Sequence, residues 1–296
     1  MKLFRALGRG GSFLGSTVPA AFLAVLVLVA LFAPWVAPMD PLAQGPDKLV
    51  GPGAHHLLGT DQFGRDILSR LLYGARADLI VSVGATAVAA VLGTTFGLVG
   101  GFFRGFIGGL SMRATEVVLA FPPIVLALLV VALFGPGTAT LIITMGILFT
   151  PTFARVTYGQ VLSVRQQDFV TASRMLGAGP GWLLFRVVLP NVLGPILVQT
   201  SLTLAATMLL ESGLSYLGVG VVPPTPSWGS MIAEAQNLAL SNPGFLIISC
   251  GIVVVTVLAF SILGDSLDRR FDPRRRNRPA GATTAANDLR TVGGAA

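Results

Sequence analysis

The sequence predicts an all-α polytopic membrane protein with six transmembrane helices. Its mean hydropathy is +0.78, and hydrophobic residues make up 53% of the 296 residues. Charged residues make up only 11%, whereas soluble domains carry about 25%. Long uncharged runs define six expected spans. A chain of this composition has to place most of its apolar surface in lipid.

Each uncharged run approaches the roughly 20 residues that a helix needs to cross a bilayer. The first follows a basic start and exceeds the apolar segment of a signal peptide, about 7–15 residues, so we expect an uncleaved first helix. The uncharged interval 117–154 is too long for one helix, and Gly135-Pro136-Gly137 divides it in two. The predicted spans are 15–37, 79–103, 117–134, 138–154, 191–210 and 245–264.

Two patterns within these runs predict local features. Phe121-Pro122-Pro123 should bend or unwind the third span, because proline lacks a hydrogen-bond donor and clashes with the preceding turn. Glycine recurs every four residues at Gly93, Gly97, Gly101, Gly105 and Gly109. The first three should allow close helix packing, and a neighbour within the chain is favoured over one in a partner subunit.

The distribution of lysine and arginine predicts cytoplasmic N- and C-termini. With an even number of spans, sixteen of the 20 basic residues fall on the side of the termini and four on the other. The expected parts are a cytoplasmic N-terminus 1–14, a six-span domain 15–266 and a basic cytoplasmic tail 267–296, disordered from about 279. The domain includes outer loops 38–78 and 211–244 and a cytoplasmic loop 161–190.

The cytoplasmic loop contains a predicted helix-turn-helix. Asp168 suits the cap or first turn of a short helix, and Phe169, Ala172 and Leu176 share one face. Gly177 should end that helix and Gly179-Pro180-Gly181 should turn the chain. A second helix, 182–189, then leads to Pro190 at the opening of the next span. Residues alone leave open whether this is an ordinary loop or a docking element for a soluble partner.

The same loop resembles the signature loop of permease subunits of binding-protein-dependent ABC importers. Thr171-Ala172-Ser173, Gly177 and Val187-Val188-Leu189-Pro190 follow its spacing, with Thr171, Ser173 and Val187 in place of Glu, Ala and Ile. The resemblance implies the type I importer permease fold and contact with an ATPase. The residues it assigns to this coupling are Asp168, Phe169, Ala172, Ser173, Leu176, Gly177, Leu189 and Pro190.

The first outer loop carries a second candidate element. Residues 61–76 read as an amphipathic helix, with Asp66 and Arg70 paired at i, i+4. Such a helix could lie in the membrane interface, or it could form an outer gate or a docking surface for a solute-binding protein. Residues 56–74, 211–218 and 226–229 resemble the C-type subunit of dipeptide, oligopeptide and nickel permeases. The outer candidates are Asp61, Arg65, Asp66 and Trp228.

This resemblance implies a subunit that forms the path for di- and oligopeptides together with a second homologous permease. It also implies two ATP-binding subunits or a fused pair, a solute-binding protein outside, and a bacterial cell membrane. ATP and Mg would bind to the partners and no cofactor to this chain. Import of nickel or glutathione-like solutes, a gradient-driven secondary transporter and a membrane scaffold remain alternatives.

Polar residues in the fifth span are candidates to line the path. Polar side chains within a span usually face protein or a water-filled cavity. For any single polar residue, a hydrogen bond to a neighbouring helix is the favoured explanation. Taken together, however, the polar residues make the fifth span the best candidate to line the path. They are Gln199, Ser201, Thr203, Thr207 and, at the outer end, Glu211.

Several chemistries are disfavoured. A phosphate-binding loop needs a lysine in a glycine-rich context, and Lys2 and Lys48 both lack it, so the chain is not expected to be an ATPase or another enzyme. His55, His56 and Cys250 offer no converging metal ligands. The net charge of +7 is explained by cytoplasmic loops, so no nucleic-acid partner is expected.

Overall fold

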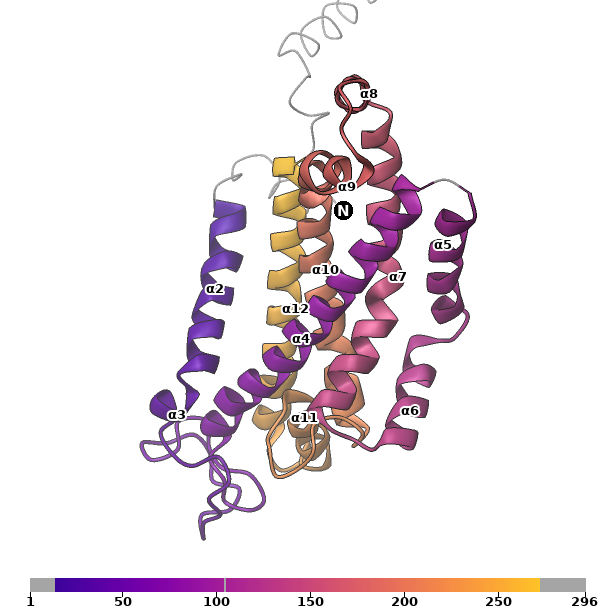
Figure 1. Ribbon diagram of the computed structural model, residues 1–296. Helices are drawn as coiled ribbons and strands as arrows, with labels where there is room; N and C mark the ends of the chain where they lie inside the picture. The colour runs from indigo at the N-terminus through magenta and orange to yellow at the C-terminus, as the bar shows by residue number, and fades with distance from the viewer. Residues whose placement is uncertain (1–13, 104, 272–296) are drawn as a thin grey trace, which may run out of the picture.

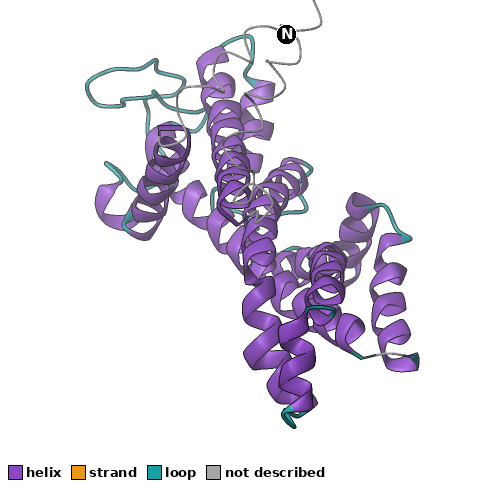
Figure 2. Cartoon of the chain, turned by 90° about the horizontal axis from the view of Figure 1, so that it is seen from above, coloured by secondary structure: helices purple, strands orange, loops and turns teal. Residues whose placement is uncertain are grey.

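The computed structural model describes residues 14–103 and 105–271, and in this part of the chain the regular structure is helical throughout (Figures 1 and 2). The expectations for the N-terminus, for Arg104 and for the tail from residue 272 lie outside the described residues. The elements are α2 Leu14–Leu31, α3 Ala33–Val36, α4 Ile67–Phe102, α5 Phe106–Leu119, α6 Pro123–Phe134, α7 Thr138–Arg165, α8 Asp168–Met175, α9 Pro180–Trp182, the π-helix η1 Leu183–Val188, α10 Leu189–Tyr216, α11 Trp228–Asn237 and α12 Pro243–Phe271.

Four helical segments of the described chain are long and apolar enough to cross a membrane. They are Ile67–Phe102, Thr138–Arg165, Pro180–Tyr216 and Pro243–Phe271. A fifth span results if α5 and α6 are counted as one broken helix, and α2 contains a shorter apolar helix, Thr17–Leu31. The fold is therefore an all-helical, multi-span membrane fold.

Two predicted spans are wrong as continuous helices. The segment 117–134 is broken at residues 120–122, where Gly108–Leu119 and Pro123–Phe134 meet at 84°. The prediction that Phe121-Pro122-Pro123 bends or unwinds this segment is confirmed. The segment 15–37 is divided at Phe32, because Pro34 cannot continue the preceding helix and instead lies in the first turn of α3.

The candidate elements lie at opposite ends of the helical bundle (Figure 1). Helix α8 lies at one end, together with the start of α2 and the end of α12. Helices α3 and α11 and the loop that precedes α4 lie at the other end. Helix α4 crosses the bundle diagonally between the two ends. This arrangement separates the predicted cytoplasmic loop from both predicted outer loops.

A seam of glycines joins α4 to α7. A Cβ atom added at Gly93 would lie 2.4 Å from the carbonyl oxygen of Thr150, and one at Gly97 would lie 2.6 Å from that of Ala154. At Gly101 the nearest atom would be Val161 Cβ, at 2.7 Å. The predicted close packing is confirmed, and the neighbour lies within the chain. Gly105 and Gly109, by contrast, have no such neighbour within 4 Å.

Buried apolar clusters hold each candidate site in place. At the α11 end, Trp228, Met231 and Phe245 pack with residues of α2, α4 and α10. At the α8 end, Val170, Leu183 and Val188 pack against Phe153 and Val161 of α7. Each exposed element is therefore fixed to the membrane-spanning helices by side chains buried beneath it.

Candidate functional site

Helix α8 ends as the sequence predicts. Asp168 lies in its first turn and Leu176 is its C-cap. Gly177 follows with φ +85°, a conformation that glycine adopts without steric cost. The Ala178 N–H donates to the Ser173 carbonyl at 3.2 Å and the Gly177 N–H to the Arg174 carbonyl at 3.1 Å. These two bonds form a Schellman motif, which fixes the direction in which the chain leaves the helix.

The exposed surface of α8 carries an apolar ridge beside the charged residues Asp168 and Arg174. Leu176 is 89% exposed, and Phe169, Ala172 and Met175 are exposed beside it. We call these four residues the coupling ridge. Val170 faces the other way, is 1% exposed and anchors the helix. Clustered apolar side chains at an exposed end typically mark a surface that contacts another protein.

Beyond the turn at residues 177–179, the chain continues as one helical segment into α10. From Pro180 the chain runs through α9 and η1 into α10, as one helical segment up to Tyr216. The predicted helix 182–189 is confirmed, with Leu189 and Pro190 in the first turn of α10. Pro190 has no N–H to offer the Arg186 carbonyl, which is consistent with the wider π turn that precedes it.

At the other end, four charged residues form a cluster that we call the outer clamp. Arg70 Nη1 donates to Asp61 Oδ2 at 2.5 Å and to Glu234 Oε2 at 2.6 Å. Arg65 Nε donates to the same Asp61 oxygen at 2.6 Å, and its Nη2 donates to Glu234 Oε2 at 2.9 Å. The clamp thus joins the loop before α4 to α11, although these segments are far apart in sequence.

The helix predicted for residues 61–76 is wrong in its first part. Asp61 Oδ1 accepts from the N–H groups of Phe63 and Arg65, which folds residues 61–65 into a tight turn. Helix α4 begins only at Ile67, and it continues into the membrane as one long helix. Asp66 caps this helix by accepting from the Ser69 N–H at 2.8 Å. The predicted Asp66–Arg70 ion pair does not form, because Arg70 binds Glu234 of the outer clamp instead.

Trp228, the first residue of α11, anchors that helix to α4. Its side chain is fully buried, and its indole N–H donates to the Leu71 carbonyl at 3.0 Å. Its backbone N–H donates to Asp78 Oδ2 at 3.1 Å. The indole ring fits closely because Gly74 lies beneath it, where a Cβ atom would be 2.9 Å from Trp228 Cδ1. The outer candidates Asp61, Arg65, Asp66 and Trp228 therefore belong to one connected structure.

Comparison with known proteins decides the family. Residues 93–277 match the model of the binding-protein-dependent transport system inner membrane component. The chain belongs to that family. This inner membrane component is therefore a multi-pass protein of the bacterial inner membrane and a transport component, not an enzyme. Its membership implies work together with a solute-binding protein and an ATPase.

Relatives of this inner membrane component cover most of its length. The di/tripeptide transport system permease protein DppC of Pseudomonas aeruginosa is 39% identical, over 86% of this chain and 87% of its own. The dipeptide transport system permease protein of Alkalihalophilus pseudofirmus is 36% identical, over 85% and 83%. The glutathione transport system permease protein GsiD of Escherichia coli is 39% identical, over 86% and 85%.

The polar residues of α10 face other helices of the inner membrane component. The Ser201 hydroxyl donates to the Phe260 carbonyl of α12 at 3.1 Å, and the Thr207 hydroxyl lies 3.4 Å from that of Thr86 on α4. Gln199 donates to Thr203 at 3.0 Å, one turn along the same helix. Glu211 is buried near the outer end. Their role in lining a path stays a prediction.

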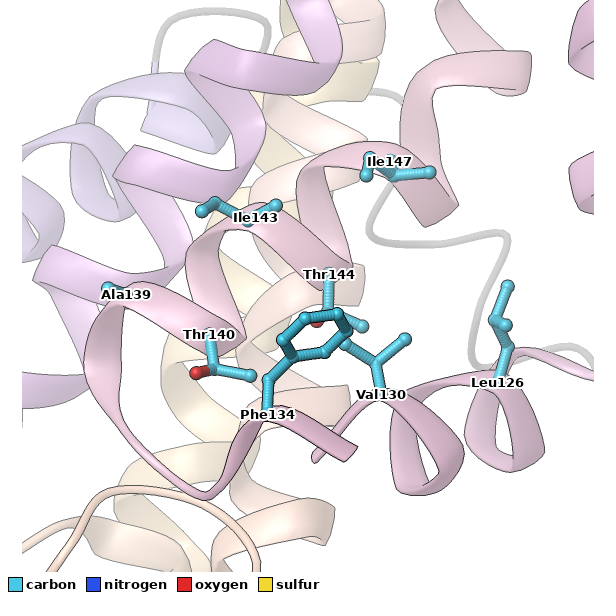
Figure 3. A pocket seen from close by; sticks show the side chains of 8 residues that line it. All are labelled: Leu126, Val130, Phe134, Ala139, Thr140, Ile143, Thr144 and Ile147. Carbon is cyan, nitrogen blue, oxygen red and sulfur yellow. The ribbon is translucent and has the colours of Figure 1, made fainter. Parts of the chain in front are cut away.

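One apolar pocket of about 440 Å³ lies between α6 and α7 (Figure 3). Val130 and Phe134 of α6 lie opposite Thr140 and Thr144 of α7. Apart from these two hydroxyl groups, its lining is hydrocarbon: Leu126, Val130, Phe134, Ala139, Ile143 and Ile147. Such a lining offers no charge to bind a charged solute, so we do not place a substrate site there.

At the α11 end of the inner membrane component, sequence reasoning missed two residues. Glu234 completes the outer clamp, and Asp78 accepts from Trp228. A signal for Glu234 existed, because the stretch 211–234 has no lysine or arginine while the first outer loop carries several arginines. Asp78 gave no comparable signal, because its partners are distant in sequence.

Proposed function

We propose that this chain is the membrane-spanning permease subunit of an ATP-driven peptide importer, with six spans, cytoplasmic termini and the type I importer fold. Three relatives, at 33–39% identity, are named for dipeptide or di/tripeptide transport. The opposite placement of α8 and the outer loops supports the predicted orientation (Figure 1). A glutathione-like solute is the second candidate, because relatives at 39% identity are named for glutathione transport.

The subunit works with partners on both sides of the membrane. A second homologous permease completes the path, and two ATP-binding subunits or a fused pair bind ATP and Mg on the cytoplasmic side. A solute-binding protein delivers the peptide to the outer side. The outer clamp and Trp228 hold the surface at that side, where the protein would dock or where an outer gate would open.

The observation that carries the proposal is the coupling ridge, together with the packing of α8 against the helical segment that continues into α10. An ATPase that grips the ridge displaces α8 when ATP binds. Val170 and Leu183 pack in one cluster, so the displacement is passed to the helical segment that begins at Pro180. Helix α10 carries Gln199, Ser201, Thr203, Thr207 and Glu211, which are the proposed path residues.

Leu176→Glu tests the coupling ridge. A charge at the centre of an apolar contact should weaken ATPase binding by at least about 2 kcal/mol, or about 30-fold in affinity. Co-purification of the ATPase and its binding constant would be measured. Leu240→Glu is the matched control, because Leu240 is equally exposed at the opposite end. Undiminished ATPase binding by Leu176→Glu would remove the ridge from the proposal.

Gly177→Val tests the exit from α8. Valine at a φ of +85° is strained by about 1–2 kcal/mol, and no neighbouring atom lies within 4 Å of the added Cβ. Peptide uptake should therefore fall sharply while membrane insertion is retained. Gly181→Val is the control, because Gly181 lies in α9 and also has open space. Equal uptake by both variants would contradict a role of the turn.

A further inference from the structure

Two acidic side chains meet inside the bundle, one from α4 and one from α10. Asp78 and Glu211 are both 0% exposed, and their carboxyl groups lie close enough to interact. They lie in the outer half of the molecule, beneath the first turn of α11. Neither belongs to the outer clamp. A buried carboxyl pair costs free energy unless each of its oxygens has a hydrogen-bond partner.

One oxygen of each carboxyl group has a donor. Asp78 Oδ2 accepts from the Trp228 backbone N–H at 3.1 Å. Glu211 Oε1 accepts from the Ser215 hydroxyl at 2.6 Å. Ser215 Oγ itself accepts from the Val221 N–H at 3.1 Å, which leaves its own hydrogen for Glu211. Both donors are thus built into the surrounding backbone and helix.

The other oxygen of each carboxyl group lacks a donor. In the described part of the chain, no N–H or O–H group reaches Asp78 Oδ1 or Glu211 Oε2. Two ionised carboxylates would therefore face each other with one bare oxygen each, in a site without water access. A single proton held between the two groups supplies the missing hydrogen bond to both.

Among the described residues, no positive charge lies beside the pair to compensate it. Glu211 is the charged group that acts on Asp78. Arg70 on α4 and Glu234 on α11 are engaged in the outer clamp, and Arg76 on α4 points to the exterior. Apart from Glu211 itself, α10 carries no charged residue. The outer halves of α7 and α12 carry none either. Apolar residues close the surroundings, among them Val81, Leu141, Leu214 and Val221.

We propose that Asp78 and Glu211 form a buried proton-binding site, in which two carboxyl groups share one proton and thereby join α4 to α10. The site differs from a metal site, since the two free oxygens fall short of the six to eight ligands that a cation such as Ca²⁺ takes. Removal of the proton leaves two like charges in contact, which drives the outer parts of α4 and α10 apart. The contact therefore weakens as pH rises.

Infrared spectroscopy of the full chain in lipid nanodiscs tests the shared proton. At neutral pH the wild type should show the C=O stretching band of a protonated carboxylic acid, shifted in D₂O. Asp78→Asn and Glu211→Gln should each remove this band, because the remaining carboxylate accepts from an amide instead. Glu116→Gln, at an exposed carboxyl group of α5, should leave it unchanged. Absence of the band from the wild type, or its persistence in both single variants, would overturn the proposal.

Thermal unfolding against pH gives a second readout. The melting temperature of the wild type should fall as pH rises from neutral, and Asp78→Asn should remove that part of the fall. An identical pH profile for the two proteins would count against a shared proton. Stabilisation of the wild type by sodium or calcium ions at neutral pH, without the acid band, would identify a cation in its place. Neither experiment measures transport, so its result is independent of the proposed function.

Discussion

Gly93→Val should separate α4 from α7 and destabilise the fold by about 3 kcal/mol or more. The added Cβ would lie 2.4 Å from the Thr150 carbonyl oxygen and 2.5 Å from Phe153 Cβ. One of these atoms belongs to the backbone, so no rotamer change relieves the clash. Overfilled cores typically lose about 1–3 kcal/mol through forced shifts, and here a whole helix has to move. The melting temperature of the protein in detergent would report the loss.

The matched control for this variant is Gly159→Val on α7. Gly159 is exposed and has no neighbour within 4 Å of an added Cβ, so only local helix propensity changes. It should melt within a few degrees of the wild type, because valine is no worse than glycine in a helix. If Gly93→Val were as stable as Gly159→Val, the glycine seam would not determine how α4 and α7 pack.

Arg70→Met is expected to open the outer clamp and to cost about 3 kcal/mol. Arg70 is almost fully buried and pairs with both Asp61 and Glu234. Its removal leaves the fully buried Asp61 with one cation, Arg65, and loosens the attachment of α11. Breaking a buried ion pair from one side typically costs about 3–5 kcal/mol. Limited proteolysis of the loops beside α11, together with thermal unfolding, would measure the effect.

Arg76→Met is the control, because Arg76 lies on the same helix but is exposed. Its effect should stay within about 0.5 kcal/mol, as for most surface substitutions. Glu234→Gln combined with Arg70→Met should cost less than the sum of the two single variants, because the two residues interact directly. Additive effects would show that the clamp does not act as a unit.

Local sequence signals predicted much of the structure around α8 and of the helix packing. The residue after the C-cap of α8 needs a positive φ, and glycine adopts this conformation most easily. A single glycine directly after the apolar pattern of 169–176 was therefore enough to predict where the helix ends. The seam at Gly93, Gly97 and Gly101 was visible because its spacing matches one helix turn. In both cases the chemistry that decides the structure lies within a few consecutive residues.

The outer site could not be predicted in the same way. Asp66 and Arg70 stand at the spacing of a helical ion pair, but Asp66 serves as a cap and Arg70 turns to Glu234. The competing partner is 164 residues away along the chain, so no local pattern reveals it. The same holds for Asp78 and Glu211, whose meeting depends on how α4 and α10 pack.

The uninterrupted run from Pro180 to Tyr216 has a mechanical meaning. Its 37 residues, at 1.5 Å each, make a rod of about 55 Å, which is longer than the roughly 30 Å hydrocarbon layer of a bilayer. One continuous helical segment, which includes the π-helix η1 and Pro195, is therefore long enough to reach from the α8 end of the bundle across a membrane. If the segment tilts as one body, a few degrees at Pro180 displace Tyr216 by several ångströms, whereas bending at η1 or Pro195 would reduce that displacement.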